Sequence, residues 1–109
     1  MDRGERLGQN EAIFRNVNEQ IEGISKALSD LTQTMDIVCE CGDITCAERV
    51  LVTVPAYERV RAEATHFIVL PGHELLDIET VVEDQGSYRV VKKQDPGARE
   101  VAEHTDPRS

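Results

Sequence analysis

Three cysteines and one histidine constrain the fold of this 109-residue chain more than any other feature. Cys39 and Cys41 are two positions apart, so in an extended segment both side chains leave the same face of the backbone. Gly42 follows and permits a turn, which allows a short loop to return Cys46 to the same place. The fourth residue, His73, follows a Pro-Gly turn at the end of an apolar run. This pattern predicts that the chain folds around one tetrahedral metal site.

Zinc is the metal that this ligand set favours, because zinc accepts three thiolates and one imidazole readily, and four protein ligands make a closed, structural site. We therefore expect Cys39, Cys41, Cys46 and His73 to bind Zn²⁺. An iron-sulfur cluster is the alternative metal centre, since three cysteines and one histidine can also hold two irons. In the known signature of that kind the histidine closely follows the third cysteine, whereas here 26 residues separate Cys46 from His73. The long separation favours zinc.

Other interpretations of these side chains stay open at the level of the sequence. A free cysteine often serves as a small buried apolar side chain, and redox-active thiols are a third interpretation. A disulfide is disfavoured, because a Cys-x-Cys bridge is strained and three cysteines leave one over. The spacing also lacks the Cys-x-x-Cys pairs of the common zinc fingers. His66, at the head of an apolar strand-like run, is a second candidate for the fourth ligand, and His104 lies in a polar tail where we expect no role.

The N-terminal residues and the charge pattern indicate the cellular compartment and the class of partner. The first residues carry charges of both signs and do not resemble a signal peptide, and no run approaches the roughly 20 apolar residues of a membrane span. We therefore expect a soluble, cytoplasmic protein, in which reduced thiols favour a metal over disulfides. The net charge of −9 and the 12 scattered Lys and Arg residues argue against nucleic-acid binding. The expected partner is another protein, although the acidity can also serve solubility alone.

An N-terminal amphipathic helix is predicted over residues 10–34, after a flexible segment at 1–9. Asn10 is suited to cap its first turn, and one face is polar and expected to lie in water. The opposite face is a narrow apolar stripe with the spacing of a heptad seam, formed by Phe14, Val17, Ile21, Ile24, Leu28 and Leu31. This stripe has two interpretations. Either it packs on the protein's own sheet, or its six residues bind a second copy or a partner protein.

Residues 35–94 are predicted to form a zinc-binding α+β domain. Alternation and turn residues predict strands at 36–40, 48–53 and 67–70, a hairpin of 78–83 with 88–92, and one helix from Thr53 to Ala64. The expected fold class is therefore α+β: the N-terminal helix, then a small zinc-stapled antiparallel β-sheet with one short helix. The chain has four aromatic residues, so its core is thin, and a structural zinc contributing about 10 kcal/mol would stabilise it. Residues 95–109 are expected to be a mobile acidic tail.

Several short motifs carry a resemblance to known proteins. They are Phe14-Arg15-x-x-Asn18-Glu19-x-Ile21, Cys39-Glu40-Cys41-Gly42 followed by Cys46, Pro71-Gly72-His73-Glu74, and Thr105-Asp106-Pro107-Arg108. With them the chain resembles a family of short uncharacterised bacterial proteins, over nearly its whole length from about residue 12. The resemblance implies a bacterial cytosolic protein. It implies no mechanism, because that family has no assigned activity.

The function expected from these features is that of a small zinc-binding adaptor or regulatory protein, which acts through protein-protein contacts and is not an enzyme. The first alternative is a thiol-based redox switch that releases zinc when its thiolates are oxidised. The second is a small zinc hydrolase. It requires that His73 is not a ligand, so that water takes the fourth position and Glu74 or Glu40 acts as general base.

Overall fold

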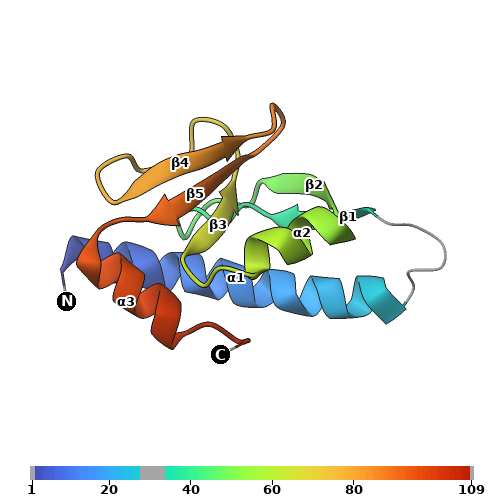
Figure 1. Cartoon of the computed structure of the whole chain (residues 1–109), viewed down its shortest axis with the longest axis horizontal. Helices are drawn as coiled ribbons and strands as arrows, with labels where there is room; N and C mark the ends of the chain where they lie inside the picture. The colour runs from blue at the N-terminus through green and yellow to red at the C-terminus, as the bar shows by residue number, and fades with distance from the viewer. Residues whose placement is uncertain (1, 28–33, 109) are drawn as a thin grey trace.

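The chain folds into an α+β structure, as the sequence predicts. The computed structural model describes residues 2–27 and 34–108, and Figure 1 shows the order of the elements. These elements are α1 (Arg3–Ala27), β1 (Thr34–Val38), β2 (Arg49–Thr53), α2 (Val54–Arg61), β3 (His66–Val69), β4 (Glu79–Asp84), β5 (Arg89–Lys93) and α3 (Pro96–His104). Within these described ranges, α1 is followed by two short helices and two sheets. The sequence predicted only one short helix and a single antiparallel sheet after the N-terminal helix.

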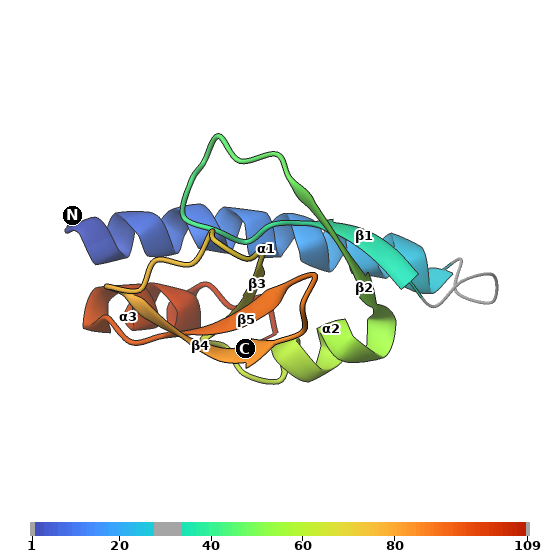
Figure 2. The same cartoon turned by 90° about the horizontal axis from the view of Figure 1, so that it is seen from above.

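Both sheets are antiparallel. β1 pairs with β2, and β5 lies between β3 and β4 in a three-stranded sheet. The strand positions follow the predicted ones because alternation marks them: in β2 only Val50 and Val52 are buried. The predicted β4–β5 hairpin is confirmed, and Gly86 in its turn has a φ of +84°, a conformation that favours glycine. In Figure 1 both sheets lie on the same side of α1, and Figure 2 shows α1 extending along the length of the molecule.

The N-terminal helix begins at Arg3, so the predicted flexible segment at 1–9 is wrong. Asp2 caps the first turn by accepting a hydrogen bond from the Glu5 amide at 2.8 Å. Gly8 then lets α3 approach closely, since a Cβ there would lie 3.3 Å from the Ala98 Cα. The predicted cap Asn10 lies inside the helix. The predicted end at residue 34 also differs, because the described helix ends at Ala27 and Thr34 begins β1, while residues 28–33 lie outside the described part.

The C-terminal segment is packed, which corrects the prediction of a mobile tail at 95–109. Asp95 caps α3 through a 3.0 Å hydrogen bond from the Ala98 amide, and Ala98 and Ala102 are buried against the rest of the protein. After the helix, Asp106 forms an ion pair with the buried Arg61, and Arg108 forms ion pairs with acidic residues of α1 and α2. The packing of this segment was not predicted because alanines give a weak apolar signal and because the ion pairs join residues far apart in the chain.

The polar face of α1 lies against the protein interior, which corrects the prediction that it faces water. Its residues recur every three or four positions and are all buried: Glu11, Arg15, Asn18 and Glu22. Arg15 illustrates the reason. Its guanidinium donates to the carbonyl of Ala64 at 2.6 Å and to that of Ala102 at 2.8 Å, and it lies 4.6 Å from the centre of the Phe67 ring. These partners offset the cost of removing the charge from water.

The apolar stripe of α1 consequently lies toward the outside. Val17 and Ile24 are 40% and 65% exposed, and the neighbouring Ile13 is 53% exposed. Phe14 and Ile21 are half-buried, and Ile21 packs against the core. The interpretation that the stripe packs on the protein's own sheet is therefore wrong for Val17 and Ile24. The last two predicted residues, Leu28 and Leu31, lie outside the described residues.

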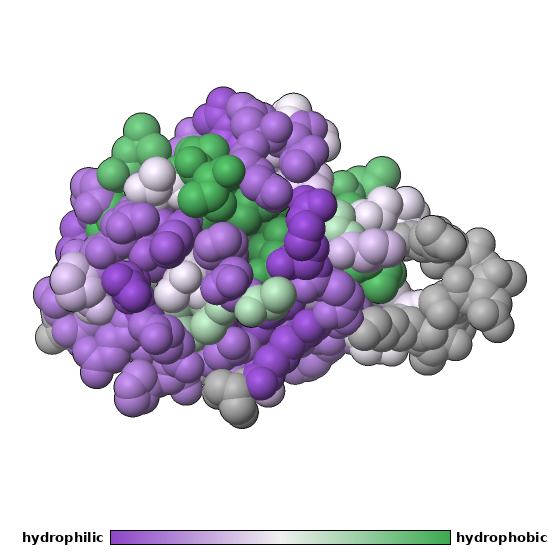
Figure 3. Space-filling view, viewed as in Figure 1, coloured by the Kyte–Doolittle hydropathy of each residue, from purple (hydrophilic) through white to green (hydrophobic). Residues whose placement is uncertain are grey.

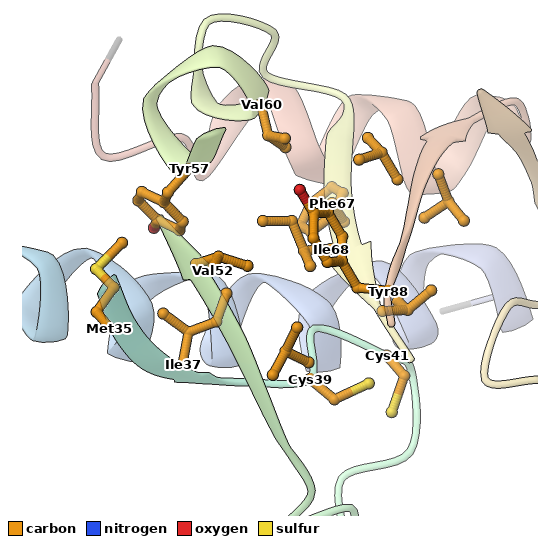
Figure 4. Packing of buried hydrophobic residues seen from close by; sticks show 14 of the residues in the cluster. Met35, Ile37, Cys39, Cys41, Val52, Tyr57, Val60, Phe67, Ile68 and Tyr88 are labelled. Atoms are coloured by element: carbon orange, nitrogen blue, oxygen red, sulfur yellow. The ribbon is translucent and has the colours of Figure 1, made fainter. Parts of the chain in front are cut away.

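The hydrophobic core is built mainly by the strands and α2. Met35, Ile37, Val52, Tyr57 and Phe67 are among its buried members. Figure 4 shows these side chains together, with the two cysteine side chains that it labels at the edge of the cluster. Cys39 and Cys41 therefore lie at the boundary between the hydrophobic core and the loops.

Candidate metal centre

Cys39 and Cys41 are placed by the segment that continues from β1. The Cys39 amide donates to the Glu48 carbonyl at 3.0 Å, which extends the pairing of the first sheet as far as the site. Gly42 follows in a confined place: a Cβ there would lie 2.9 Å from terminal carbon atoms of both Leu7 and Leu75, so these side chains would have to shift. The sequence suggested that this glycine permits a turn, but its backbone is not in the left-handed region, so the structure gives a different reason for it.

Cys46 is returned to the site by a short loop centred on Asp43. The Asp43 carboxylate accepts hydrogen bonds from the Thr45 amide at 2.9 Å and the Thr45 hydroxyl at 2.6 Å. The Asp43 carbonyl accepts from the Cys46 amide at 2.9 Å. This is the local turn that aspartate favours in loops. It places Cys46 half-buried beside the two buried cysteines.

His73 is presented by a tight turn after β3. The His73 amide donates to the Leu70 carbonyl at 3.0 Å, and Gly72 has a φ of +91°. Pro71 at the second position and a glycine with positive φ at the third are the features of a type II turn. The Pro-Gly pair of the sequence therefore turns the chain just where the histidine must meet the cysteines.

The four predicted ligands come together at one point. The ligand atoms of Cys39, Cys41, Cys46 and His73 all lie within 4.8 Å of one another. His73 Nδ1 is 3.6 Å from Cys39 Sγ and 3.7 Å from Cys46 Sγ. Two ligands on a tetrahedral zinc, with bonds of about 2.3 Å to sulfur and 2.0 Å to nitrogen, are separated by about 3.6 Å. The group can therefore bind a metal ion.

The protonation of the thiols also suits a cation. The Cys39 thiol donates a hydrogen bond to Cys41, which lowers the pKa of Cys41 to about 5 and raises the pKa of Cys39. Burial raises the pKa of Cys46. A bound cation would displace the protons that the thiols still hold, because zinc binds the thiolate form.

Backbone and side-chain hydrogen bonds fix the ligands to the second sheet. The Leu70 amide donates to Cys39 Sγ at 3.3 Å. Next to it, the Glu40 amide donates to the Ile68 carbonyl at 2.8 Å, and the Glu40 carboxylate accepts from the Ile68 amide at 3.0 Å. Such bonds orient the ligands that carry them. The segment with the first two cysteines therefore joins β3 of the three-stranded sheet to β1 of the other.

Asn18 of α1 supports the same segment. Its side-chain amide donates to the Val38 carbonyl at 2.8 Å and to the Glu40 carboxylate at 2.7 Å, and its oxygen accepts from the Val38 amide at 2.8 Å. Burial raises the pKa of Glu40, and the bond from Asn18 opposes that rise. Sequence reasoning missed Asn18 because it placed this face of the helix in water. The available signal was its place in the same motif as Arg15.

Replacing Asn18 should weaken both the fold and the metal site. Asn18→Ala leaves the Val38 amide and the buried Glu40 carboxylate without these bonds, so we expect a loss of about 3 kcal/mol in the free energy of unfolding. Urea unfolding measures this loss, and the rate of zinc transfer to a chromogenic chelator should rise in the same variant. Gln85→Ala, an exposed amide in the β4–β5 turn, is the control and should change stability by less than about 0.5 kcal/mol. Equal effects of the two substitutions would contradict this role.

The other two histidines lie away from the centre. His66, the second candidate for the fourth ligand, begins β3, whereas the site lies beyond the other end of that strand. His104 is an exposed residue at the end of α3, 4.0 Å from Glu100. Among the described residues, the group that can hold a metal contains neither of them.

The carboxylates near the centre already have protein partners. Glu40 is fully buried and bonded as described above. Glu74 accepts from Arg89 at 2.6 Å and from the Gly72 amide at 2.9 Å. A depression of about 290 Å³ lies over the centre, lined by Cys41, Gly42, Asp43, Gly72, His73, Glu74 and Leu75. Two members of the metal-binding group, Cys41 and His73, therefore line this depression.

Comparison of the chain with family models, with curated proteins and with solved structures finds no match. The resemblance to a family of short bacterial proteins therefore stays a prediction. Among the described residues, no helix combines the length and the apolar character needed to cross a bilayer.

Proposed function

We propose that this protein is a small cytoplasmic zinc-binding adaptor or regulatory protein that acts through contacts with other protein chains. One observation carries the proposal: three sulfur atoms and one imidazole nitrogen lie within 4.8 Å of one another. Four protein ligands complete the tetrahedral coordination of zinc, and sites of that kind are structural. The metal would therefore serve to hold the fold together.

The position of the centre supports a structural role. Cys39, Cys41 and Cys46 belong to the loop of the two-stranded sheet, while His73 belongs to the loop after β3 in the other sheet. An ion bound by all four would add a link between the two sheets to the hydrogen bonds between Glu40 and Ile68. A chain of this size buries limited apolar surface, so such a link contributes a large part of its stability.

The spacing of the ligand atoms supports zinc over an iron-sulfur cluster. A two-iron cluster places its protein ligands on two metal atoms joined by sulfides, which spreads them farther apart than ligands on one ion. Here each ligand atom is within 4.8 Å of every other. Thiolates and imidazole are also ligands that zinc accepts together.

An adaptor role agrees better with this geometry than hydrolysis does. A hydrolytic zinc keeps one coordination position for water, whereas this group supplies four protein ligands. The carboxylates that could act as general base, Glu40 and Glu74, are held by other protein groups. Function would then depend on binding at the protein surface, where α1 presents an exposed apolar face.

Metal analysis of ligand variants tests the proposal. Protein purified under reducing conditions should contain one zinc per chain by elemental mass spectrometry. Cys46→Ser and His73→Ala should lose most of it, because each removes one ligand, while His66→Ala should retain it. Retention of full zinc content by His73→Ala would exclude the four-ligand site and favour the hydrolytic alternative.

The exposure of Cys46 supports a second candidate function, the redox switch. Cys46 is the half-buried member of the group, so a small oxidant reaches it before the buried pair. Hydrogen peroxide would oxidise two thiolates to a disulfide, with its oxygens reduced to water, and the zinc would leave. Zinc release at low peroxide doses that a thiol reductant reverses would favour this switch. Retention of zinc at those doses would favour the purely structural role.

A further inference from the structure

The exposed face of α1 carries no charge over several turns. Charged and polar residues cover much of the molecule, as the face drawn in Figure 3 shows, and 30% of the chain is charged. Between residues 7 and 25, however, every charged side chain of α1 is turned inward: Glu11, Arg15, Glu19 and Glu22. The exposed positions of that stretch, called here the outer face, are Gln9, Ile13, Asn16, Val17, Gln20, Gly23 and Ile24.

The outer face is also apolar along its middle. Ile13, Val17 and Ile24 follow the spacing of a helix ridge and are 40% to 65% exposed. From Gln9 to Ile24 the face is about 22 Å long at the rise of an α-helix. A groove of about 560 Å³ lies beside it, lined by Gln9, Ala12, Ile13, Asn16, Thr105 and Pro107. A ridge next to a groove is the surface relief that lets one helix pack against another.

We propose that the outer face binds the outer face of a second copy of this chain, with the two α1 helices antiparallel. The inference deepens the proposed function by naming the partner of the exposed helix face, and it does not depend on which metal the centre holds. A two-fold interface brings the same residues of both copies together. In an antiparallel pair centred between Val17 and Gln20, Ile13 lies opposite Ile24 of the partner subunit.

The charge of the chain is the reason for choosing a second copy. Two copies with a net charge of −9 repel each other, and repulsion is smallest where the contact surfaces are uncharged. A basic or an acidic partner would be recognised through groups of opposite charge, which the outer face does not present. Its residues suit self-pairing, because apolar groups match their own kind and the amides of Asn16 and Gln20 both donate and accept.

Gly23 supports the same arrangement. Glycine within a helix costs about 1 kcal/mol relative to alanine. Among the described residues, no atom lies within 4 Å of the position that a Cβ of Gly23 would take, so their packing does not require a glycine there. A glycine on the outer face lets a second helix approach closely.

Sedimentation analysis of charge variants tests the pairing. The zinc-bound protein should dimerise with a dissociation constant of about micromolar, as a contact near the lower end of interface sizes gives. Ile13→Lys and Ile24→Glu should each weaken the dimer by about tenfold or more, because a charge is desolvated against an apolar side chain. The double variant should recover part of this loss, since in the antiparallel pair each lysine faces a glutamate of the partner subunit.

Controls separate this inference from the proposed function. Leu51→Glu places the same charge on an exposed apolar residue of β2, away from the outer face, and should leave the dimer unchanged. Added salt should strengthen the wild-type dimer by screening repulsion. Zinc content is measured in every sample, so a monomeric variant with full zinc supports the inference. A wild-type protein that stays monomeric, or a dimer insensitive to both single variants, overturns it and leaves the zinc site intact.

Discussion

Chelation of the metal should unfold most of the protein at 25 °C. A structural zinc contributes on the order of 10 kcal/mol, which is comparable to the 5–15 kcal/mol stability that is typical of a whole domain. The loss is expected to be large here because the centre would link the loops of two separate sheets in a domain with a thin core. Near-UV circular dichroism of the buried Tyr57 and Tyr88 measures the loss of packing, and added zinc should restore the signal.

The control for this experiment is the same chelator already saturated with zinc, which should leave the spectrum unchanged. Cys39→Ser should behave like the chelated wild-type protein, since it removes a buried ligand. A chelated protein that keeps its tyrosine signal and its cooperative thermal transition would show that the fold does not need the metal. The cysteines would then be small apolar members of the core.

Loss of the buried Lys93 should produce the second large effect. Lys93 forms ion pairs with Glu11 of α1 and Glu79 of β4, and all three side chains are fully buried. Its ammonium also lies 4.9 Å from the centre of the Phe67 ring. Lys93→Met keeps the apolar stem but leaves two carboxylates without their cation, so we expect the free energy of unfolding to fall by about 3–5 kcal/mol at neutral pH.

Lys92→Met is the matched control, because the neighbouring side chain on β5 is only half-buried. It should change the free energy of unfolding by less than about 0.5 kcal/mol. Urea titrations of both variants provide the comparison. Similar midpoints for the two would mean that the buried ion pairs contribute little to the fold.

The pH dependence of stability provides a second readout of the same cluster. Burial raises the pKa of Glu11 well above its ordinary value of 4.5. A carboxyl with a raised pKa binds its proton more tightly in the folded state, so its contribution is complete below pH 4.5 and is lost as the pH rises through the folded-state pKa. Lys93→Met removes the cation that opposes this rise. The deficit of the variant should therefore shrink on acidification.

The strands and the metal-binding group were predictable because their signals are local. Alternation in β2 and the turn at Gly86 depend on neighbouring residues only. Chelation imposes a similar local rule: the Cys39-x-Cys41 spacing places two sulfurs on one side, and the turn before His73 positions the imidazole. Sequence reasoning therefore found the four residues that the structure brings together.

The orientation of α1 was not predictable from its periodicity. Both faces repeat every three or four residues, and the usual rule assigns the apolar face to the interior. Here Arg15 reaches carbonyls of two distant segments, and Asn18 binds the strand end next to Cys39. Such partners depend on tertiary structure. The polar face is therefore inside and the apolar face outside.

The C-terminal segment was missed for a related reason. Arg108 pairs with Glu19 and Glu58, residues that lie 89 and 50 positions earlier in the chain. Asp106 similarly pairs with Arg61. No short window of sequence contains both members of such a pair. The motif Thr105-Asp106-Pro107-Arg108 is thus explained by structure, since it fastens the end of the chain to α1 and α2.

X-ray absorption spectroscopy of the protein as purified tests the metal centre most directly. Zinc coordinated by Cys39, Cys41, Cys46 and His73 should show three sulfur atoms at about 2.3 Å and one nitrogen atom at about 2.0 Å around a single ion. The absorption edge identifies the element in the same measurement. A spectrum without the outer-shell scattering of an imidazole ring, a second metal atom near the first, or the absence of a stoichiometric metal would contradict the closed zinc site proposed here.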